Sequence, residues 1–222
     1  MRDGEGRAGD GYAGYRARLV ERLQEQGIRD LAVLRAVGET PRHLFVPEAL
    51  RERAYEDAAL PIGRGQTISQ PLTHARYLEA LALQGQERVL EIGTGTGYQT
   101  ALLARLAAQV FSVERLSDLA SRARDALAQA GARNTTVLVG DGSLGWRPYA
   151  PYDAILVAAA GPSIPQPLLE QLADGGRLLM PVGPPGAQEM VRVTRRGSER
   201  LEEHLAAASF VPLIGRHGTD HV

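Results

Sequence analysis

Short apolar runs alternate with helical patterns along the sequence from residue 88 to residue 182. The apolar runs are too short to be buried helices, and the segments between them repeat their apolar residues at helical spacing. Such alternation is typical of an α/β fold with a mostly parallel, doubly wound sheet, because a parallel strand needs a crossover connection to reach the next. The expected strands are 88–92, 110–113, 137–139, 154–158 and 178–182, and the expected helices begin near residues 98, 117 and 166.

The alternation ends in the last part of the sequence. Two further candidate strands, 189–194 and about 204–211, follow one another without a helix between them. This order predicts an antiparallel C-terminal hairpin that closes the sheet. The pair Gly175 and Gly176 is expected to end the last helix, which we place near 166–172. The whole pattern predicts one Rossmann-like sheet.

The segments before the sheet differ in character. Residues 1–14 combine five glycines with charges, a composition that predicts a flexible leader. Residues 15–60 repeat apolar residues at helical spacing, which predicts a helical N-terminal subdomain. Residues 61–71, PIGRGQTISQP, have little charge and no helical period, so we expect an ordered loop of the kind that often holds functional groups. With the sheet expected within 85–215, residues 15–222 are predicted to form a single domain.

The composition excludes several kinds of chemistry. The 222 residues include no Cys and no Lys. Disulfides, thiol nucleophiles and thiolate metal sites are therefore impossible, as are a Walker phosphate loop and Schiff-base catalysis. The formal charge is −1, and no apolar stretch approaches the roughly 20 residues that span a bilayer. We expect a cytoplasmic protein with no nucleic-acid partner and no membrane partner.

A glycine run, Glu91-Ile92-Gly93-Thr94-Gly95-Thr96-Gly97, follows the first predicted strand directly. Glycines let the backbone turn sharply and approach a ligand closely, next to the free amides of a helix N-terminus. The dinucleotide fingerprint would require a glycine where Tyr98 stands. The spacing, with an acid two residues before Gly93, fits a loop that cradles S-adenosylmethionine better than one that binds a pyrophosphate. A tight turn without a ligand is the alternative.

Two more acids stand at the ends of the next predicted strands. Glu114 lies 21 residues after Gly93, an offset at which an acid accepts hydrogen bonds from ribose hydroxyls. Asp141 stands between Gly140 and Gly142, where a carboxylate could accept from an adenine amino group. The alternatives are a solvated strand-end charge for Glu114 and a plain turn for Asp141. Because open α/β sheets bind ligands at the carboxyl ends of their strands, these acids predict a nucleoside site there.

These motifs and their flanks resemble the protein-L-isoaspartate O-methyltransferase family over residues from about 18 to 215. The most specific block is the segment 61–71. The supporting blocks are 40–42 with 45–47, the glycine run, 113–115, Gly140-Asp141-Gly142 with Gly145-Trp146, 151–155, the sequence LLEQLADGGRLLMPVG, and 210–213. The resemblance implies a Rossmann-like methyltransferase fold that uses S-adenosyl-L-methionine and releases S-adenosyl-L-homocysteine.

The resemblance also implies a substrate and a set of site residues. The substrate is the free carboxylate of an L-isoaspartyl residue in a peptide or damaged protein, and we expect a monomeric enzyme. By similarity Ser69 is the active-site hydroxyl. The residues expected at the cofactor are Glu91, Gly93, Gly95, Gly97, Glu114, Asp141 and Gly142. The residues expected at the substrate are Thr67, Ile68, Gln70, Val211, Pro212 and Leu213.

Other interpretations exist for single residues. Without the resemblance, Ser69 would be interpreted as a turn hydroxyl bonded to its own backbone. A hydrolase pair of Ser69 and His74 is a weaker alternative, because the sequence contains no G-x-S-x-G elbow. His217 and His221 have a spacing that a metal could use on a helix, yet Gly218 favours a loose tail. We therefore expect no metal site.

Two rival functions remain at this stage. A dedicated peptide aspartyl O-methyltransferase would methylate normal aspartate in one partner peptide. Such relatives tend to carry an extra C-terminal partner-binding region, and this sequence ends soon after the family core, which favours the repair enzyme. A catalytically silent cofactor-binding protein is the second rival, and the intact segment around Ser69 argues against it.

Overall fold

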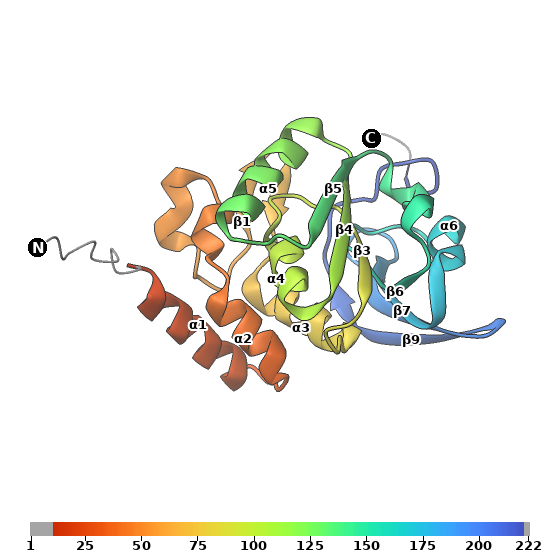
Figure 1. Ribbon diagram of the computed structural model, residues 1–222, viewed down its shortest axis with the longest axis horizontal. Coiled ribbons are helices and arrows are strands. Elements are labelled where there is room, and N and C mark those ends of the chain that lie inside the picture. Colours follow the sequence, from red (N-terminus) through yellow and green to blue (C-terminus); the bar gives the residue numbers. More distant parts are fainter. Residues whose placement is uncertain (1–10, 220–222) are drawn as a thin grey trace, which may run out of the picture.

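A seven-stranded sheet forms the centre of the computed structural model, which describes residues 11–219 (Figure 1). Its strands are β3 (Arg88–Ile92), β4 (Gln109–Glu114), β5 (Thr135–Val139), β6 (Tyr152–Val157), β7 (Leu172–Val182), β8 (Gln188–Arg196) and β9 (Glu199–Ala208). They are arranged in the order β5-β4-β3-β6-β7-β8-β9. The pairs from β5 to β7 are parallel, whereas β7–β8 and β8–β9 are antiparallel. The predicted fold class is confirmed, including the antiparallel C-terminal hairpin.

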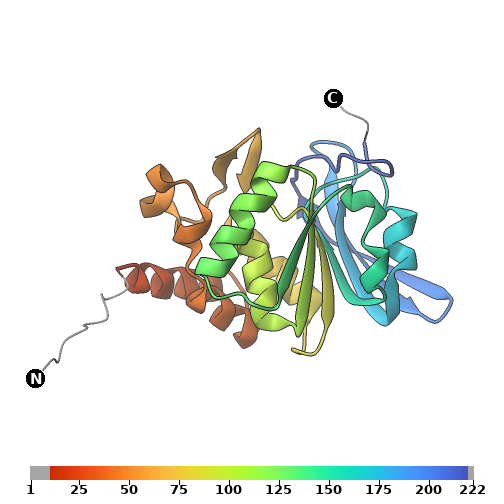
Figure 2. The same cartoon turned by 45° about the horizontal axis from the view of Figure 1, so that its top comes forward.

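Helices cover both faces of this sheet. They are α3 (Pro71–Leu81), α4 (Tyr98–Leu106), α5 (Ser117–Gln129) and α6 (Gln166–Glu170), with short 3-10 turns η3 (Gly142–Leu144) and η4 (Arg147–Tyr149). Figure 2 shows α4 and α5 on one face and α6 on the other. Val89 and Leu90 of β3 are both fully buried, but they belong to different apolar clusters, because successive side chains of a strand point to opposite faces. This explains why the sequence of β3 is a continuous apolar run.

The N-terminal segment adds a helical layer outside α3 and α4. It contains α1 (Ala13–Glu25), α2 (Leu31–Glu39), η1 (Arg42–Phe45) and η2 (Glu48–Arg53). The Asp30 carboxylate caps α2 by accepting from the backbone amides of Ala32 at 2.8 Å and Val33 at 3.2 Å. Helix α1 begins inside the predicted leader, whose residues 1–10 lie outside the described part of the chain. The domain boundaries given above stay predictions.

The predicted loop 61–71 has more regular structure than its sequence indicated. Strands β1 (Leu60–Gly63) and β2 (Gln66–Ile68) pair in an antiparallel hairpin, and α3 begins directly at Pro71. The turn has positive φ angles at Gly63, Arg64 and Gly65, a conformation that glycine adopts without strain. The strands are too short for a clear period of two, so the sequence pattern suggested a loop instead.

Two predicted boundaries at the end of the sheet were also wrong. Helix α6 ends at Glu170, and the pair Gly175 and Gly176 lies inside β7 rather than after a helix. The pairing of β6 with β7 is irregular at this point, and an added Cβ on Gly176 would lie 2.9 Å from the Ala173 carbonyl oxygen. Strand β9 spans 199–208 instead of about 204–211. Its first residues are charged, which an exposed edge strand tolerates.

The described residues show two further features of the chain. No helix within 11–219 is long and apolar enough to cross a bilayer. The same residues contain no group of three or more His, Asp or Glu side chains placed to hold a metal ion. Of the histidine pair considered above, His217 is exposed and His221 lies outside the described residues.

Candidate active site

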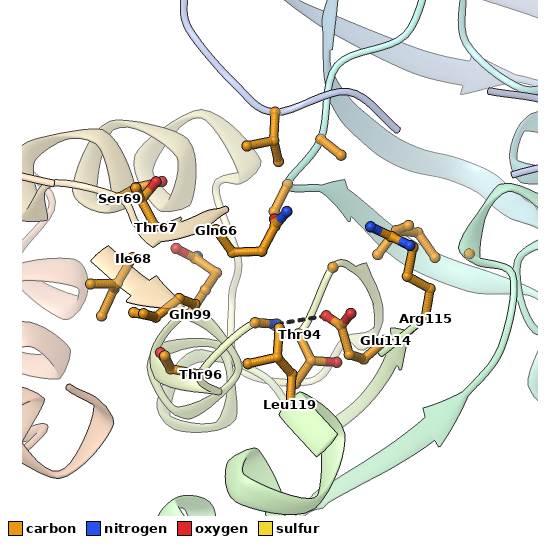
Figure 3. Close-up of a pocket in the computed structure, with 18 of the residues that line it drawn as sticks. Gln66, Thr67, Ile68, Ser69, Thr94, Thr96, Gln99, Glu114, Arg115 and Leu119 are labelled. Atoms are coloured by element: carbon orange, nitrogen blue, oxygen red, sulfur yellow. Dashed lines mark hydrogen bonds between the residues drawn. The ribbon is translucent and has the colours of Figure 1, made fainter. Parts of the chain in front are cut away.

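A cavity lies at the carboxyl ends of β3 and β4, between the sheet and the β1–β2 hairpin (Figure 3). This is the edge of the sheet at which open α/β proteins bind ligands, and it lies next to the N-terminus of α4. Its wall combines segments that lie far apart in the sequence. The predicted site residues that line it are Thr67, Ile68, Ser69, Gly93, Gly95, Glu114, Gly142, Val211, Pro212 and Leu213. The structure thus brings these residues together, and their individual roles remain predictions.

The glycine run turns away from β3 with three positive φ angles. They are +93° at Gly93, +55° at Gly95 and +89° at Gly97. Gly93 and Gly95 line the cavity, whereas Gly97 does not. An added Cβ on Gly97 would lie 3.2 Å from Leu127 and 3.3 Å from Ala123, both on α5. Gly97 therefore permits close packing of α4 against α5, rather than close approach to a ligand.

Glu91 lies beneath the glycine run and is fully buried. One carboxylate oxygen accepts from the hydroxyls of Thr100 and Ser112, and the Ser112 hydroxyl also bonds Thr94 in the run at 2.6 Å. The other oxygen is buried without a hydrogen-bond partner among the described residues. Burial raises the pKa of Glu91 to about 7. The structure therefore places this predicted cofactor residue behind the cavity wall, as a support for the loop.

Glu114 ends β4 and faces the cavity with little exposure. One carboxylate oxygen accepts from the Gly95 amide at 2.9 Å, and the other accepts from the Leu116 amide at 3.0 Å. These bonds fix the carboxylate beside the glycine run, where it can still accept from ribose hydroxyls through its remaining lone pairs. Figure 3 shows the bond to Gly95 and the neighbouring side chain of Arg115.

Asp141, a predicted cofactor residue, is hydrogen-bonded within the protein and lies outside the cavity wall. Its carboxylate accepts from the Ser143 amide at 2.9 Å, the Ser143 hydroxyl at 2.7 Å and the Arg216 amide at 2.8 Å. Burial opposes ionisation, but these hydrogen bonds outweigh it and lower the pKa of Asp141. Asp141 lies in a neighbouring hollow with Arg216 and is not part of the cavity wall. Gly142, which follows it, does line the cavity, and an added Cβ there would overlap Ile92.

Ser69 follows β2 at the edge of the cavity and is half-buried. Its hydroxyl makes no hydrogen bond with any residue from 11 to 219, so it is not a turn hydroxyl bonded to its own backbone. Its carbonyl oxygen accepts from the Arg42 guanidinium at 2.8 Å. Gln70, which precedes α3 and provides the first helical carbonyl to Thr73 at 3.1 Å, does not line the cavity. The backbone around Ser69 is therefore held from behind while its hydroxyl stays free to meet a ligand.

His74 on α3 and Gln99 on α4 are nearly fully buried and line the cavity beside Ser69. His74 Nδ1 and Gln99 Oε1 are hydrogen-bonded to each other. Burial, with a contribution from the charge of Arg42, lowers the pKa of His74 to about 3. The imidazole is therefore neutral and a weak base at pH 7, which argues against a hydrolase pair with Ser69.

The C-terminal segment completes the wall. Its residues 211–213 run beside Ala160, whose amide donates to the Val211 carbonyl at 2.8 Å and whose carbonyl accepts from the Leu213 amide at 2.7 Å. Leu213 is buried, whereas Pro212 is exposed at the mouth. Backbone pairing with Ala160 thus holds this segment in the cavity wall.

Comparison with known proteins decides the family. The sequence profile of the family described as Protein-L-isoaspartate(D-aspartate) O-methyltransferase matches residues 8–218. The chain belongs to this family. A protein-L-isoaspartate O-methyltransferase of Methanoculleus marisnigri is 54% identical over 204 residues, covering 91% of this chain and 93% of that one. Another, from Dictyoglomus thermophilum, is 49% identical over 207 residues, covering 93% and 94%.

Solved structures of the same family share the fold. One titled protein-L-isoaspartate O-methyltransferase aligns with a TM-score of 0.83 at 28% identity, covering 91% of this chain and 67% of that chain. A Plasmodium falciparum protein aligns with a TM-score of 0.80 at 24% identity, covering 90% and 98%. Its title describes a putative family member in complex with S-adenosyl-L-homocysteine. The predicted family resemblance is confirmed.

The residues present fit the family's cofactor, S-adenosyl-L-methionine. Gly93 and Gly95 bring no side chain to the cavity wall, and the open hydrogen-bonding capacity of Glu114 suits a ribose. Gly142 keeps the wall thin where a larger residue would overlap Ile92. These features occur together at the N-terminus of α4, so the residues at this end of the cavity fit the cofactor.

Some residues of the cavity were not among the predicted site residues. Gln66, Gln99 and Arg115 line it, and Arg42 supports it from behind. Gln99 could have been found, because it stands in the first turn of the helix that follows the glycine run. Arg42 could not, because nothing in its local sequence indicates that an arginine so near the N-terminus is buried against the backbone of residue 69.

Proposed function

We propose that this protein transfers the methyl group of S-adenosyl-L-methionine to the free carboxylate of L-isoaspartyl residues in peptides and damaged proteins. The observation that carries this proposal is that the free Ser69 hydroxyl and the Glu114 carboxylate line one cavity. An acceptor bound at Ser69 therefore meets a nucleoside bound at Glu114 within the same enclosed space. Membership of the protein-L-isoaspartate O-methyltransferase family supports the assignment of the substrate.

The chain's own residues have simple tasks in this reaction. When bound, the cofactor supplies a methyl group on a positively charged sulfur. Ser69 orients the acceptor carboxylate by donating a hydrogen bond, so that one oxygen points along the line of transfer. A carboxyl with an ordinary pKa near 4 is already ionised at pH 7, so no general base is required. The neutral His74 is consistent with this, because a weak base beside Ser69 removes no proton.

The repair role follows from the chemistry of the product. The backbone amide nitrogen that follows the isoaspartyl residue attacks the methyl ester, expels methanol and closes a succinimide. Hydrolysis of the succinimide restores some normal aspartate. We propose that the partners are isoaspartyl-containing peptides and proteins, that the enzyme acts as a monomer, and that it works in the cytoplasm. S-adenosyl-L-homocysteine is the released product.

The test compares two peptides that differ only at one linkage. Purified protein is incubated with methyl-labelled cofactor and with matched isoaspartyl and aspartyl peptides. Base-labile label on the isoaspartyl peptide alone is the expected result. Label on the aspartyl peptide alone would indicate a dedicated peptide aspartyl methyltransferase, and label on neither, with cofactor binding intact, would indicate a catalytically silent protein.

A further inference from the structure

A fully buried arginine lies directly behind the Ser69 end of the cavity. Arg42 belongs to η1 and has no exposed surface. Its Nε donates to the Ala54 carbonyl at 2.7 Å, and its Nη2 donates to the Ser69 carbonyl at 2.8 Å. The centre of its guanidinium group lies 4.5 Å from the centre of the Tyr98 ring. The side chain thus joins the N-terminal helical layer to the backbone of the residue whose hydroxyl meets the substrate.

The partners of this cation are neutral. Within residues 11–219 Arg42 has no carboxylate at ion-pair distance, and its Nη1 is buried without a hydrogen-bond partner. Burial lowers the pKa of Arg42, and the charge of Asp57 is the weakest of the influences that oppose this. The Asp57 carboxylate already accepts from the Leu72 amide at 3.1 Å and from Gln26 at 3.2 Å. A guanidinium stays charged in proteins. Arg42 is therefore a buried cation without a close counter-charge.

The charge of Arg42 acts on the cavity wall. It disfavours protonation of His74, which itself lines the cavity. Two more buried polar atoms close by, Nε2 of His74 and Nε2 of Gln99, have no hydrogen-bond partner in the described part of the chain. The Ser69 end of the cavity is therefore polar and lies in the positive field of Arg42, although none of the side chains at its surface there is charged.

The charged side chains of the wall lie elsewhere. Among the described residues that line the cavity, the acidic and arginine side chains are Glu114 and Arg115. Figure 3 shows both on the side of the cavity away from Ser69. Neither acid nor base at the surface therefore competes with the buried guanidinium for an anion that enters beside Ser69.

We propose that Arg42 is a specificity-determining positioning residue that makes the Ser69 end of the cavity select a carboxylate over a neutral group of the same shape. This inference rests on the proposed function, in which the acceptor is a carboxylate. The guanidinium lies behind the Ser69 backbone, so it acts on the acceptor through its charge and does not touch the substrate. Methyl transfer converts the carboxylate into a neutral ester, so the same field no longer holds the product and favours its release.

The test measures how well each variant distinguishes an anion from its neutral analogue. Calorimetry with S-adenosyl-L-homocysteine bound gives Kd for an isoaspartyl peptide and for the same peptide with that carboxylate replaced by a carboxamide. The wild type should prefer the carboxylate by about tenfold or more. Arg42→Met should reduce the preference to within about twofold, and Arg42→Lys should keep most of it. Arg105→Met, which removes a cation bonded to Glu39 and Thr40 outside the cavity, is the matched control and should leave the preference unchanged.

If Arg42 acted only through its hydrogen bonds, Arg42→Met would weaken binding of both peptides equally. The ratio of their Kd values would then be unchanged, and this result would overturn the inference. Loss of the preference in Arg115→Met, with retention in Arg42→Met, would assign it to Arg115 and also overturn the inference.

A second measurement uses the wild type, so it does not depend on a variant that folds. The carboxyl of the bound peptide, followed by carbon-13 NMR, should have a pKa about one unit lower than in free peptide. An unchanged or raised pKa contradicts the role of Arg42. If the wild type neither binds nor methylates the isoaspartyl peptide, the proposed function itself fails.

Discussion

The two ends of the cavity each rest on one buried ionisable group, and the two groups behave differently. Glu91 supports the glycine run through Ser112 and Thr94, and Arg42 supports the β1–β2 hairpin through the Ser69 carbonyl. Both are fully buried. A buried carboxyl can shed its charge by taking up a proton, whereas a guanidinium cannot. The cofactor end therefore rests on a support that can become neutral, and the Ser69 end rests on one that stays charged.

This difference matches the ligand chemistry proposed for each end. A nucleoside binds through neutral hydroxyls and needs a rigid frame, which the hydrogen-bonded Glu91 provides. A carboxylate acceptor carries charge, which the field of Arg42 favours. The predictions that follow change one end at a time, so that each shows whether the two ends act independently.

The largest expected effect is at the Ser69 end. Ser69→Ala should lower kcat about 100-fold, because the acceptor carboxylate loses the hydrogen bond that aligns it for transfer. Affinity for S-adenosyl-L-homocysteine should change less than about twofold, since the cofactor end is untouched. Labelled methyl transfer and calorimetry measure the two quantities. Ser198→Ala, at an exposed turn between β8 and β9, is the control. An equal loss of cofactor affinity in Ser69→Ala would show that the two ends are not separate.

The next effect is at the cofactor end. Glu114→Gln should weaken binding of S-adenosyl-L-homocysteine about 30-fold, in line with roughly 1.5 to 3 kcal/mol for a hydrogen bond to a charged group. The new amide also places a donor against the Gly95 or Leu116 amide, both of which now donate to Glu114. Calorimetry on this variant and on Asp125→Asn, at an exposed position of α5, gives the comparison. Unchanged affinity for S-adenosyl-L-homocysteine would show that the nucleoside does not bind at Glu114.

Much of the cofactor end could be predicted from sequence because its signals are local. A short apolar strand, a glycine run and a helix occupy consecutive residues, and the register of β3 against β4 follows from burial of both strands. Gly93 and Glu114, which the sequence placed at the ends of two successive strands, both line one cavity. Glu91 lies behind the cavity wall, a position that the sequence did not indicate. Alternation along β3 decides which face it points to, and a continuous apolar run does not show that alternation.

The rest of the site depends on contacts between distant residues. Asp141 was expected to face a ligand, but Arg216, which is 75 residues away, donates to its carboxylate. Arg42 meets the Ser69 carbonyl across 27 residues. Neither contact follows from periodicity or turn chemistry, because both arise only when the C-terminal segment and the N-terminal layer pack against the sheet.

A smaller effect should appear as a change of stability with pH. Burial raises the pKa of Glu91 from 4.5 to about 7, so the folded state binds this proton more tightly than the unfolded state. Its contribution to stability is fully present below pH 4.5 and is lost as the pH rises through 7. Glu91→Gln resembles the protonated form at every pH. The free energy of unfolding of the variant, minus that of the wild type, should therefore be about 2 kcal/mol larger at pH 8 than at pH 5.

Denaturant titrations at both pH values test this expectation for Glu91. The control is Glu21→Gln, an exposed position on α1, which should show no such difference between the two pH values. The stability of the wild type could instead fall no more steeply with pH than that of Glu91→Gln. That result would mean that folding does not raise the pKa of Glu91, and the contrast between Glu91 and Arg42 would disappear.

The smallest effect is expected at the tip of the β1–β2 hairpin. Arg64 has a φ of 56° and an exposed ion pair with Asp118 at 3.2 Å. Arg64→Gly removes the backbone strain but also the ion pair, worth roughly 0.2 to 1 kcal/mol at the surface, and it adds entropy to the unfolded chain. These terms oppose one another, so stability should change by less than about 1 kcal/mol, and kcat/KM for the isoaspartyl peptide should stay within about threefold. A larger loss of activity at unchanged stability would show that the Ser69 end is held from its outer tip by Asp118 rather than from within by Arg42.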